Sequence, residues 1–212
     1  MKVALIGATG NAGSRILAEL LSRGHEVTGI ARHLETLSSQ ARLTKQQGDV
    51  NNEHGLAELL SGHDAVISAL APPLGEGQGF VAANRNLIAA LKRAGVRRLV
   101  VVGGAGSLEV APGVQVIDSP AFRALPEERK PGALAHREAL GLLRESDLDW
   151  TYLSPPFLLV PGERTGKFRL GRDQLLLGDN GESKISFEDF AVALVDELET
   201  PRHSRQRFTV GY

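Results

Sequence analysis

The chain has no cysteine and is poor in tyrosine and tryptophan, with two of the first and one of the second among its 212 residues. Without cysteine it has neither a disulfide framework nor a thiolate nucleophile, and zinc bound by cysteine is excluded. The six histidines lie scattered, without the spacing of metal ligands. We therefore predict no metal site and no chemistry that depends on thiols.

Charge of one sign and long apolar runs are also missing. The formal net charge is −1 at pH 7, which argues against a nucleic-acid surface or a polybasic membrane anchor. No stretch approaches the roughly 18 apolar residues of a membrane span. Glycines interrupt the first apolar run at once, unlike the apolar core of a signal peptide. We expect a cytoplasmic protein that binds neither nucleic acid nor membrane.

Short apolar runs alternate with helical patterns of apolar residues along the chain. Runs at residues 3–6, 27–30, 65–69 and 99–102 indicate buried strands, and the periodic segments at residues 16–21, 56–60 and 87–91 indicate helices. We also predict a polar strand in "RLTKQQGDV", a helix over about residues 131–146, a strand in "DWTYLSPP", a helix in "SFEDFAVALVDEL" and a last strand in "QRFTV". This alternation predicts an α/β fold with a Rossmann-type, doubly wound parallel sheet.

The first strand is followed by "GATGNAG", in which Gly7, Gly10 and Gly13 stand at every third position. In a strand–turn–helix setting this spacing is the fingerprint of a dinucleotide site. Gly7 would permit the tight turn, Gly10 would let a pyrophosphate approach the backbone, and Gly13 would let the helix pack closely on the strand. The N-terminus of the following helix would present free N–H groups and a positive dipole end to the phosphates.

The end of the second strand bears on which dinucleotide is bound. It reads "VTGIARH" and offers Arg32 where sites that prefer NAD carry a carboxylate for the ribose 2′-hydroxyl. The planar fork of an arginine suits a 2′-phosphate, so NADP(H) is favoured over NAD(H). The alternative is that Arg32 is only a solvated loop cation. Asp49 in "GDV" either lies near the adenine amino group or forms an ordinary turn.

One domain accounts for the whole length. We expect a single NAD(P)-binding domain over residues 1–212, with a nucleotide-binding core over about residues 1–155. A small C-terminal substrate lobe, over about residues 156–212, would fold back on this core. Its residues 160–186 are rich in charge and glycine. With loops at residues 71–79 and 103–130, the lobe is expected to shape the substrate pocket.

Seven segments together resemble the atypical short-chain dehydrogenase/reductases: "GATGNAG", "IARH", "QQGDV", "HDAVISAL", "RRLVVVGGAGS", "LRESDLDWTYLSPP" and "ISFEDFAVALVDELE". Within them the chain is most similar to the NADH-flavin reductase group of NAD(P)H-binding proteins. It also resembles biliverdin-IXβ/flavin reductase and, more distantly, the NmrA-like redox sensors. The resemblance covers nearly the whole chain.

The resemblance also implies roles for individual residues along the cofactor. Besides the residues already named, it places Thr9, Asn11 and Ala12 at the pyrophosphate, Val50 at the adenine, Leu70 and Ala71 beneath the nucleotide, Gly103 and Gly104 at the nicotinamide side, and Pro155, Pro156 and Phe157 in the wall of the nicotinamide pocket.

The chain departs from the standard dehydrogenases of this class in its acid–base residues. These enzymes use a Tyr-x-x-x-Lys pair, in which the lysine lowers the tyrosine pKa. Here Pro156 stands four residues after Tyr152, and Tyr212 is the last residue, so the pair is absent. His136 could supply a proton near neutral pH instead. The alternative is that His136 is a partly exposed helix residue without a catalytic role.

Hydride transfer to a conjugated acceptor needs less help than carbonyl reduction, because the acceptor delocalises the charge and takes its proton from water. We therefore expect an NADPH-dependent oxidoreductase that reduces a flavin, a quinone or a similar small molecule, with flavin as a candidate substrate. The rival hypothesis is a non-catalytic NADP(H)-binding redox sensor that acts through a protein partner. A nucleotide-sugar epimerase or dehydratase is disfavoured by the missing pair. The sequence makes no prediction about the oligomeric state.

Overall fold

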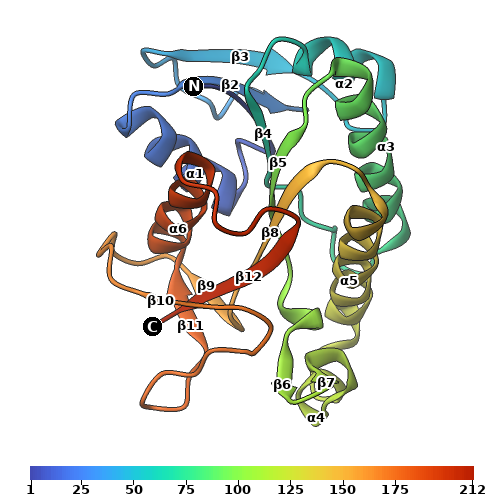
Figure 1. Ribbon diagram of the computed structural model, residues 1–212, viewed down its shortest axis with the longest axis vertical. Helices are drawn as coiled ribbons and strands as arrows, with labels where there is room; N and C mark the ends of the chain where they lie inside the picture. The colour runs from blue at the N-terminus through green and yellow to red at the C-terminus, as the bar shows by residue number, and fades with distance from the viewer.

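A twisted sheet runs through the middle of the molecule and carries helices on both faces, as the computed structural model of residues 1–212 shows (Figure 1). The eight strands follow the order β10-β12-β8-β5-β4-β1-β2-β3. All neighbours in this sheet are parallel except β10 and β12. The strands are β1 (Lys2–Ile6), β2 (Glu26–Ala31), β3 (Leu43–Gln47), β4 (Ala65–Ser68), β5 (Arg98–Val102), β8 (Asp149–Ser154), β10 (Arg169–Gly171) and β12 (Gln206–Gly211).

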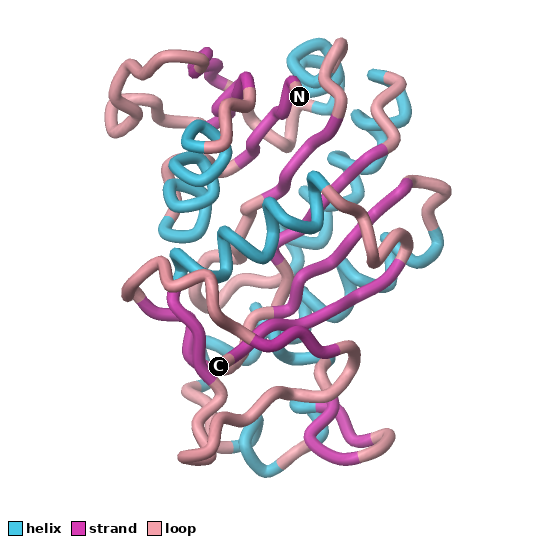
Figure 2. Tube along the Cα trace, turned by 60° about the vertical axis from the view of Figure 1, so that its left-hand side comes forward, coloured by secondary structure: helices cyan, strands magenta, loops and turns pink.

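Two apolar layers cover the two faces of this sheet. In β1, Val3 and Leu5 pack toward α1 (Asn11–Ser22) and α6 (Phe187–Glu199). Ala4 and Ile6 point the other way, toward α2 (Glu53–Leu60), α3 (Gln78–Ala94) and α5 (Lys130–Glu145). Figure 2 shows helices in front of and behind the strands. Since successive side chains of a strand face opposite sides, a strand buried on both faces is apolar throughout.

The polar strand predicted in "RLTKQQGDV" is β3, and its position explains its composition. It lies at the edge of the sheet beside β2, and residues 44–47 are exposed. An edge strand needs no continuous apolar run, and charged side chains there discourage pairing with another chain. The predicted fold class, a doubly wound parallel sheet, is confirmed.

Shorter elements lie outside the main sheet. Between β5 and α5 the chain forms a hairpin of β6 (Glu109–Ala111) and β7 (Val114–Gln115), the short helix α4 (Pro120–Arg123) and single helical turns. β9 (Leu158–Val160) and β11 (Lys184–Ser186) pair in parallel as a separate two-stranded sheet. No helix is both long and apolar enough to cross a membrane.

The C-terminal segment folds back on the main sheet. β12 pairs in parallel with β8, and α6 packs beside α1 on the sheet. β9, β11 and the loops around them lie outside the main sheet as a peripheral lobe. Local periodicity predicts a strand but not its partner, and the insertion of β12 beside β8 was therefore missed.

Candidate functional site

The glycine turn after β1 is built so that only glycine fits at its first and last positions. Gly7 has a φ of +80°, and a Cβ there would lie 2.7 Å from the carbonyl oxygen of Ala69. A Cβ on Gly13 would lie 2.0 Å from the carbonyl oxygen of Gly7. The predicted tight turn and close helix–strand packing are thus both present, because a methyl group at Gly13 would push α1 away from β1.

Gly10 differs from its two neighbours in the turn. Its φ is −75°, which suits any residue, and a Cβ there would meet only the Gly7 oxygen, at 3.4 Å. Gly10 is also the N-cap of α1, where no side chain caps the helix and the first turn carries no acidic residue. The first N–H groups of a helix lack partners within it and favour an anion. The fold itself therefore does not need glycine at position 10, whereas a phosphate group approaching α1 does.

A cleft of about 410 Å³ opens beside this turn, at the carboxyl ends of β1, β2 and β4. This edge of the sheet is where such folds bind ligands, at the point where the strand order reverses. Eight of the predicted residues line it: Gly7, Thr9, Gly10, Arg32, Asp49, Val50, Leu70 and Ala71.

The cleft also has walls formed by the loop at residues 71–79, which was expected to shape the substrate pocket, and by the start of α3, which was not expected there. The loop after β4 supplies Pro73 and Glu76, and the start of α3 supplies Gly79, Phe80 and Ala83. Phe80 and Ala83 lie three residues apart on one face of α3, so helical periodicity was the available signal. The remaining lining residues are Ile6, Ile30, Ala31, Gly48, Asn51 and Ala69.

Arg32, Asp49 and Glu76 give this cleft its charges. The Arg32 side chain is exposed at the mouth and forms no ion pair within the protein, while its carbonyl oxygen accepts a hydrogen bond from Nε2 of Gln47 at 3.0 Å. Oδ1 of Asp49 accepts from the backbone N of Asn51 at 2.9 Å and from its Nδ2 at 3.0 Å. Asp49 thus forms the turn that was its alternative role and lines the cleft as well.

The other predicted cofactor residues lie along the same edge but outside the cleft. Asn11, Ala12 and Gly13 form the first turn of α1. Gly103 and Gly104 follow β5, and the N–H of Gly103 still pairs with the carbonyl oxygen of Leu153 at 2.8 Å. Pro155, Pro156 and Phe157 follow β8, where Phe157 is exposed.

Burial keeps His136, the candidate proton donor, neutral, and it also favours the neutral form of Tyr152. Burial lowers the pKa of His136 to about 4 and raises the pKa of Tyr152 above its usual range. Neither an imidazolium donor nor a tyrosinate is therefore present at pH 7, so the expected use of His136 as an acid is not favoured. Its ring packs against Phe80, with 4.6 Å between the ring centroids.

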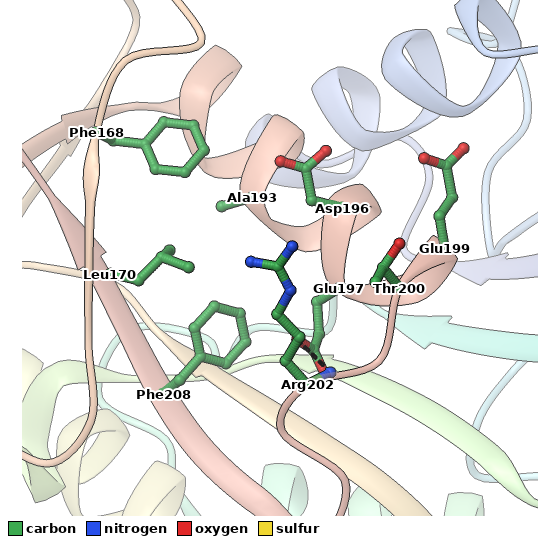
Figure 3. A pocket seen from close by; sticks show the side chains of 9 residues that line it. All are labelled: Phe168, Leu170, Ala193, Asp196, Glu197, Glu199, Thr200, Arg202 and Phe208. Atoms are coloured by element: carbon green, nitrogen blue, oxygen red, sulfur yellow. Dashed lines mark hydrogen bonds between the residues drawn. The ribbon is translucent and has the colours of Figure 1, made fainter.

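A second cavity, of about 210 Å³, lies between α6, β10 and β12, away from the glycine turn (Figure 3). Its apolar side chains include Phe168, Leu170 and Phe208. Asp196 and Glu199 at its rim both pair with Arg23. Both carboxylates therefore have an ion-pair partner within the protein, and the cavity shares no residue with the cleft.

Comparisons with known proteins agree with a dinucleotide site in this chain. The family described as NAD(P)H-binding matches residues 7–201. The protein YwnB of Bacillus subtilis is 42% identical over 216 residues, which cover 99% of this chain and 98% of YwnB. A solved structure of a candidate epimerase from Bacteroides thetaiotaomicron is 41% identical, with a TM-score of 0.92 over 100% of this chain and 96% of that one. A candidate NADH-flavin reductase from Streptococcus pneumoniae is 34% identical, with a TM-score of 0.83 over 100% and 99%.

Proposed function

This chain belongs to the NAD(P)H-binding family, and we propose that it is an NADPH-dependent oxidoreductase that reduces a flavin, a quinone or a similar conjugated acceptor. The likeness to a candidate NADH-flavin reductase supports a reductase role in general. The preference for NADPH and the class of acceptor are our proposal.

The observation that carries the proposal is the open backbone at Gly10 beside the unpaired guanidinium of Arg32. Gly10 leaves room at the N-terminus of α1, where the pyrophosphate would bind the amides of Asn11 and Ala12. Arg32, at the end of β2, would bind the 2′-phosphate through its planar fork. A carboxylate there would favour NAD(H), and this position has none.

The nicotinamide half would extend along the edge beyond the cleft, toward the residues that follow β5 and β8. Gly103 and Gly104 would form one wall of that half, and Pro155, Pro156 and Phe157 the other. The exposed Phe157 ring could pack on a flat acceptor. These are proposals that follow from the family resemblance and from the shared edge of the sheet.

A bound NADPH would supply a hydride, that is, a proton together with two electrons. The acceptor gains this hydride and takes one further proton from water, so that the protein need not donate one. The chain's part is to hold the donor and the acceptor in contact and to limit competing reactions. The neutral states of His136 and Tyr152 agree with such a role.

The absence of a tyrosine–lysine pair argues against an epimerase or dehydratase. Those reactions require a positioned acid–base pair, and no lysine contacts the buried Tyr152 hydroxyl. The epimerase activity named for the Bacteroides protein therefore does not suit this chain.

The test is a binding titration followed by a turnover assay. The purified protein is titrated with NADPH and with NADH, and NADPH oxidation is then followed with FMN, FAD, a quinone and biliverdin. We expect tighter binding of NADPH than of NADH, and turnover with at least one acceptor. Tight NADPH binding without any turnover would contradict the reductase proposal and favour a redox sensor.

A further inference from the structure

Tyr152 lies directly against the glycine pair that follows β5, and its side chain is only 1% exposed. A Cβ on Gly103 would lie 2.1 Å from Cε1 of the tyrosine ring, and a Cβ on Gly104 would lie 2.7 Å from Cγ of His136. The φ of Gly104 is −127°, which any residue adopts. Glycine is therefore needed here for space, because two rings occupy the positions that side chains would take.

The Tyr152 hydroxyl joins three elements at this point. It accepts a hydrogen bond from the N–H of Gly104 at 3.1 Å and donates one to the carbonyl oxygen of His136 in α5 at 3.0 Å. The regular pairing of β5 with β8 ends one residue earlier, at Gly103. The hydroxyl thus extends the hydrogen bonding past the end of the sheet and fixes the Gly104 peptide relative to β8 and α5.

His136 connects this glycine pair to the cofactor cleft. Phe80 lines the cleft, and its ring packs at a tilt of 57° on the His136 ring. The same His136 side chain also lies against Gly104. Phe80, His136 and Gly104 therefore form a series of contacts that begins in the wall of the cleft.

We propose that Tyr152 and His136 are positioning residues that hold the peptide between Gly103 and Gly104 as the wall of the nicotinamide half of the site. The proposal rests on the proposed function, because it assumes a dinucleotide along this edge. Neither side chain has to be charged for this role, since packing and neutral hydrogen bonds are sufficient.

The test separates the two halves of the cofactor. Tyr152→Phe keeps the ring against Gly103 but leaves the partly buried N–H of Gly104 without its partner, and an unpaired donor shielded from water is costly. We expect the Kd for NADPH to rise about five- to tenfold. The Kd for adenosine 2′,5′-bisphosphate, which lacks the nicotinamide half, should stay within about twofold because its contacts are remote from Tyr152.

Trp150→Phe is the matched control, because Trp150 is a buried aromatic residue on the same strand and the same face. Its indole N–H has no partner to lose. This variant should lower the Tm while leaving the ratio of the two Kd values unchanged. A purely structural role of Tyr152 would give the same pattern as the control.

A second pair of variants decides the matter if Tyr152→Phe does not fold. His136→Ala removes the ring between Phe80 and Gly104 and should weaken NADPH more than the bisphosphate. His136→Phe keeps a ring of similar shape and should retain the NADPH affinity. If His136→Phe loses NADPH binding as fully as His136→Ala, a packing role is wrong.

The outcomes distinguish this inference from the proposed function. If the unaltered protein binds neither NADPH nor the bisphosphate, the proposed function fails. If it binds both, and if Tyr152→Phe changes the two Kd values equally or not at all, the positioning role is overturned while the cofactor site stands.

Discussion

Replacing Gly10 with alanine should abolish tight cofactor binding without harming the fold. The φ and ψ of Gly10 are −75° and 171°, which alanine adopts easily, and its Cβ would come no closer than 3.4 Å to the Gly7 oxygen. A glycine-to-alanine change at a compatible position stabilises a protein by about 0.4–1 kcal/mol. The small loss from the close contact offsets part of this, so we expect the free energy of unfolding to change by less than about 1 kcal/mol.

The bound state should respond quite differently. A methyl group at position 10 would occupy the surface that a pyrophosphate must approach at the start of α1. We expect the Kd for NADPH to rise at least about tenfold, which corresponds to about 1.4 kcal/mol of binding free energy. Gly13→Ala should instead lower the stability by about 1–3 kcal/mol, as overpacked positions do, because its Cβ would lie 2.0 Å from the Gly7 oxygen.

The assay combines thermal unfolding without ligand and an NADPH titration for each variant. Gly141→Ala is the control, because Gly141 lies within α5 and a Cβ there meets nothing within 4 Å. This variant should raise the stability by about 0.5–1 kcal/mol and leave the Kd unchanged. Wild-type NADPH affinity in Gly10→Ala would show that the phosphates bind elsewhere.

Three further predictions concern titratable side chains. Arg32→Ala should weaken the binding of NADPH about 10- to 100-fold, the range of a charge-assisted hydrogen bond, and that of NADH less than about twofold. An equal loss for both cofactors, or a similar loss in the exposed control Arg137→Ala, would contradict the 2′-phosphate assignment. Hydrogen bonding to Arg164 lowers the pKa of Glu19, so the stabilising effect of this ion pair is lost as the pH falls below about 4.5. Glu19→Gln should therefore lower the Tm at pH 7 much more than at about pH 3. Burial lowers the pKa of His136 to about 4, so its neutral form stabilises the fold fully above about pH 6.5 and less as the pH falls toward 4. His136→Phe should remove this part of the pH dependence of the Tm, and an unchanged pH dependence would count against it.

The parts of the site that could be predicted from sequence are those encoded by adjacent residues. The strand, turn and helix around Gly7 and Gly13 follow from one continuous stretch, and Arg32 follows from the end of the next strand. Short-range rules of backbone conformation and helix ends govern all of these. The polar edge strand β3 could also be located, because the order of strands and helices requires an element there.

The contacts that were missed join residues distant in the chain. The hydrogen bond between Gly104 and Tyr152 spans 48 positions, and no local pattern indicates that this ring lies against Gly103. Phe80 enters the cleft only because α3 packs on the sheet in one particular rotation. The place of β12 beside β8 likewise depends on how the last helix returns the chain to the sheet.

We propose that this chain binds NADPH at the glycine turn and passes its hydride to a conjugated acceptor without a protein acid. A single-turnover experiment tests it most directly: the protein–NADPH complex is mixed without oxygen with FMN or a quinone, and the loss of the nicotinamide absorbance is timed. We expect a loss much faster than that of free NADPH with the same acceptor, at a rate that varies little between about pH 6 and pH 8. Bound NADPH that is oxidised no faster than free NADPH by any acceptor would contradict it.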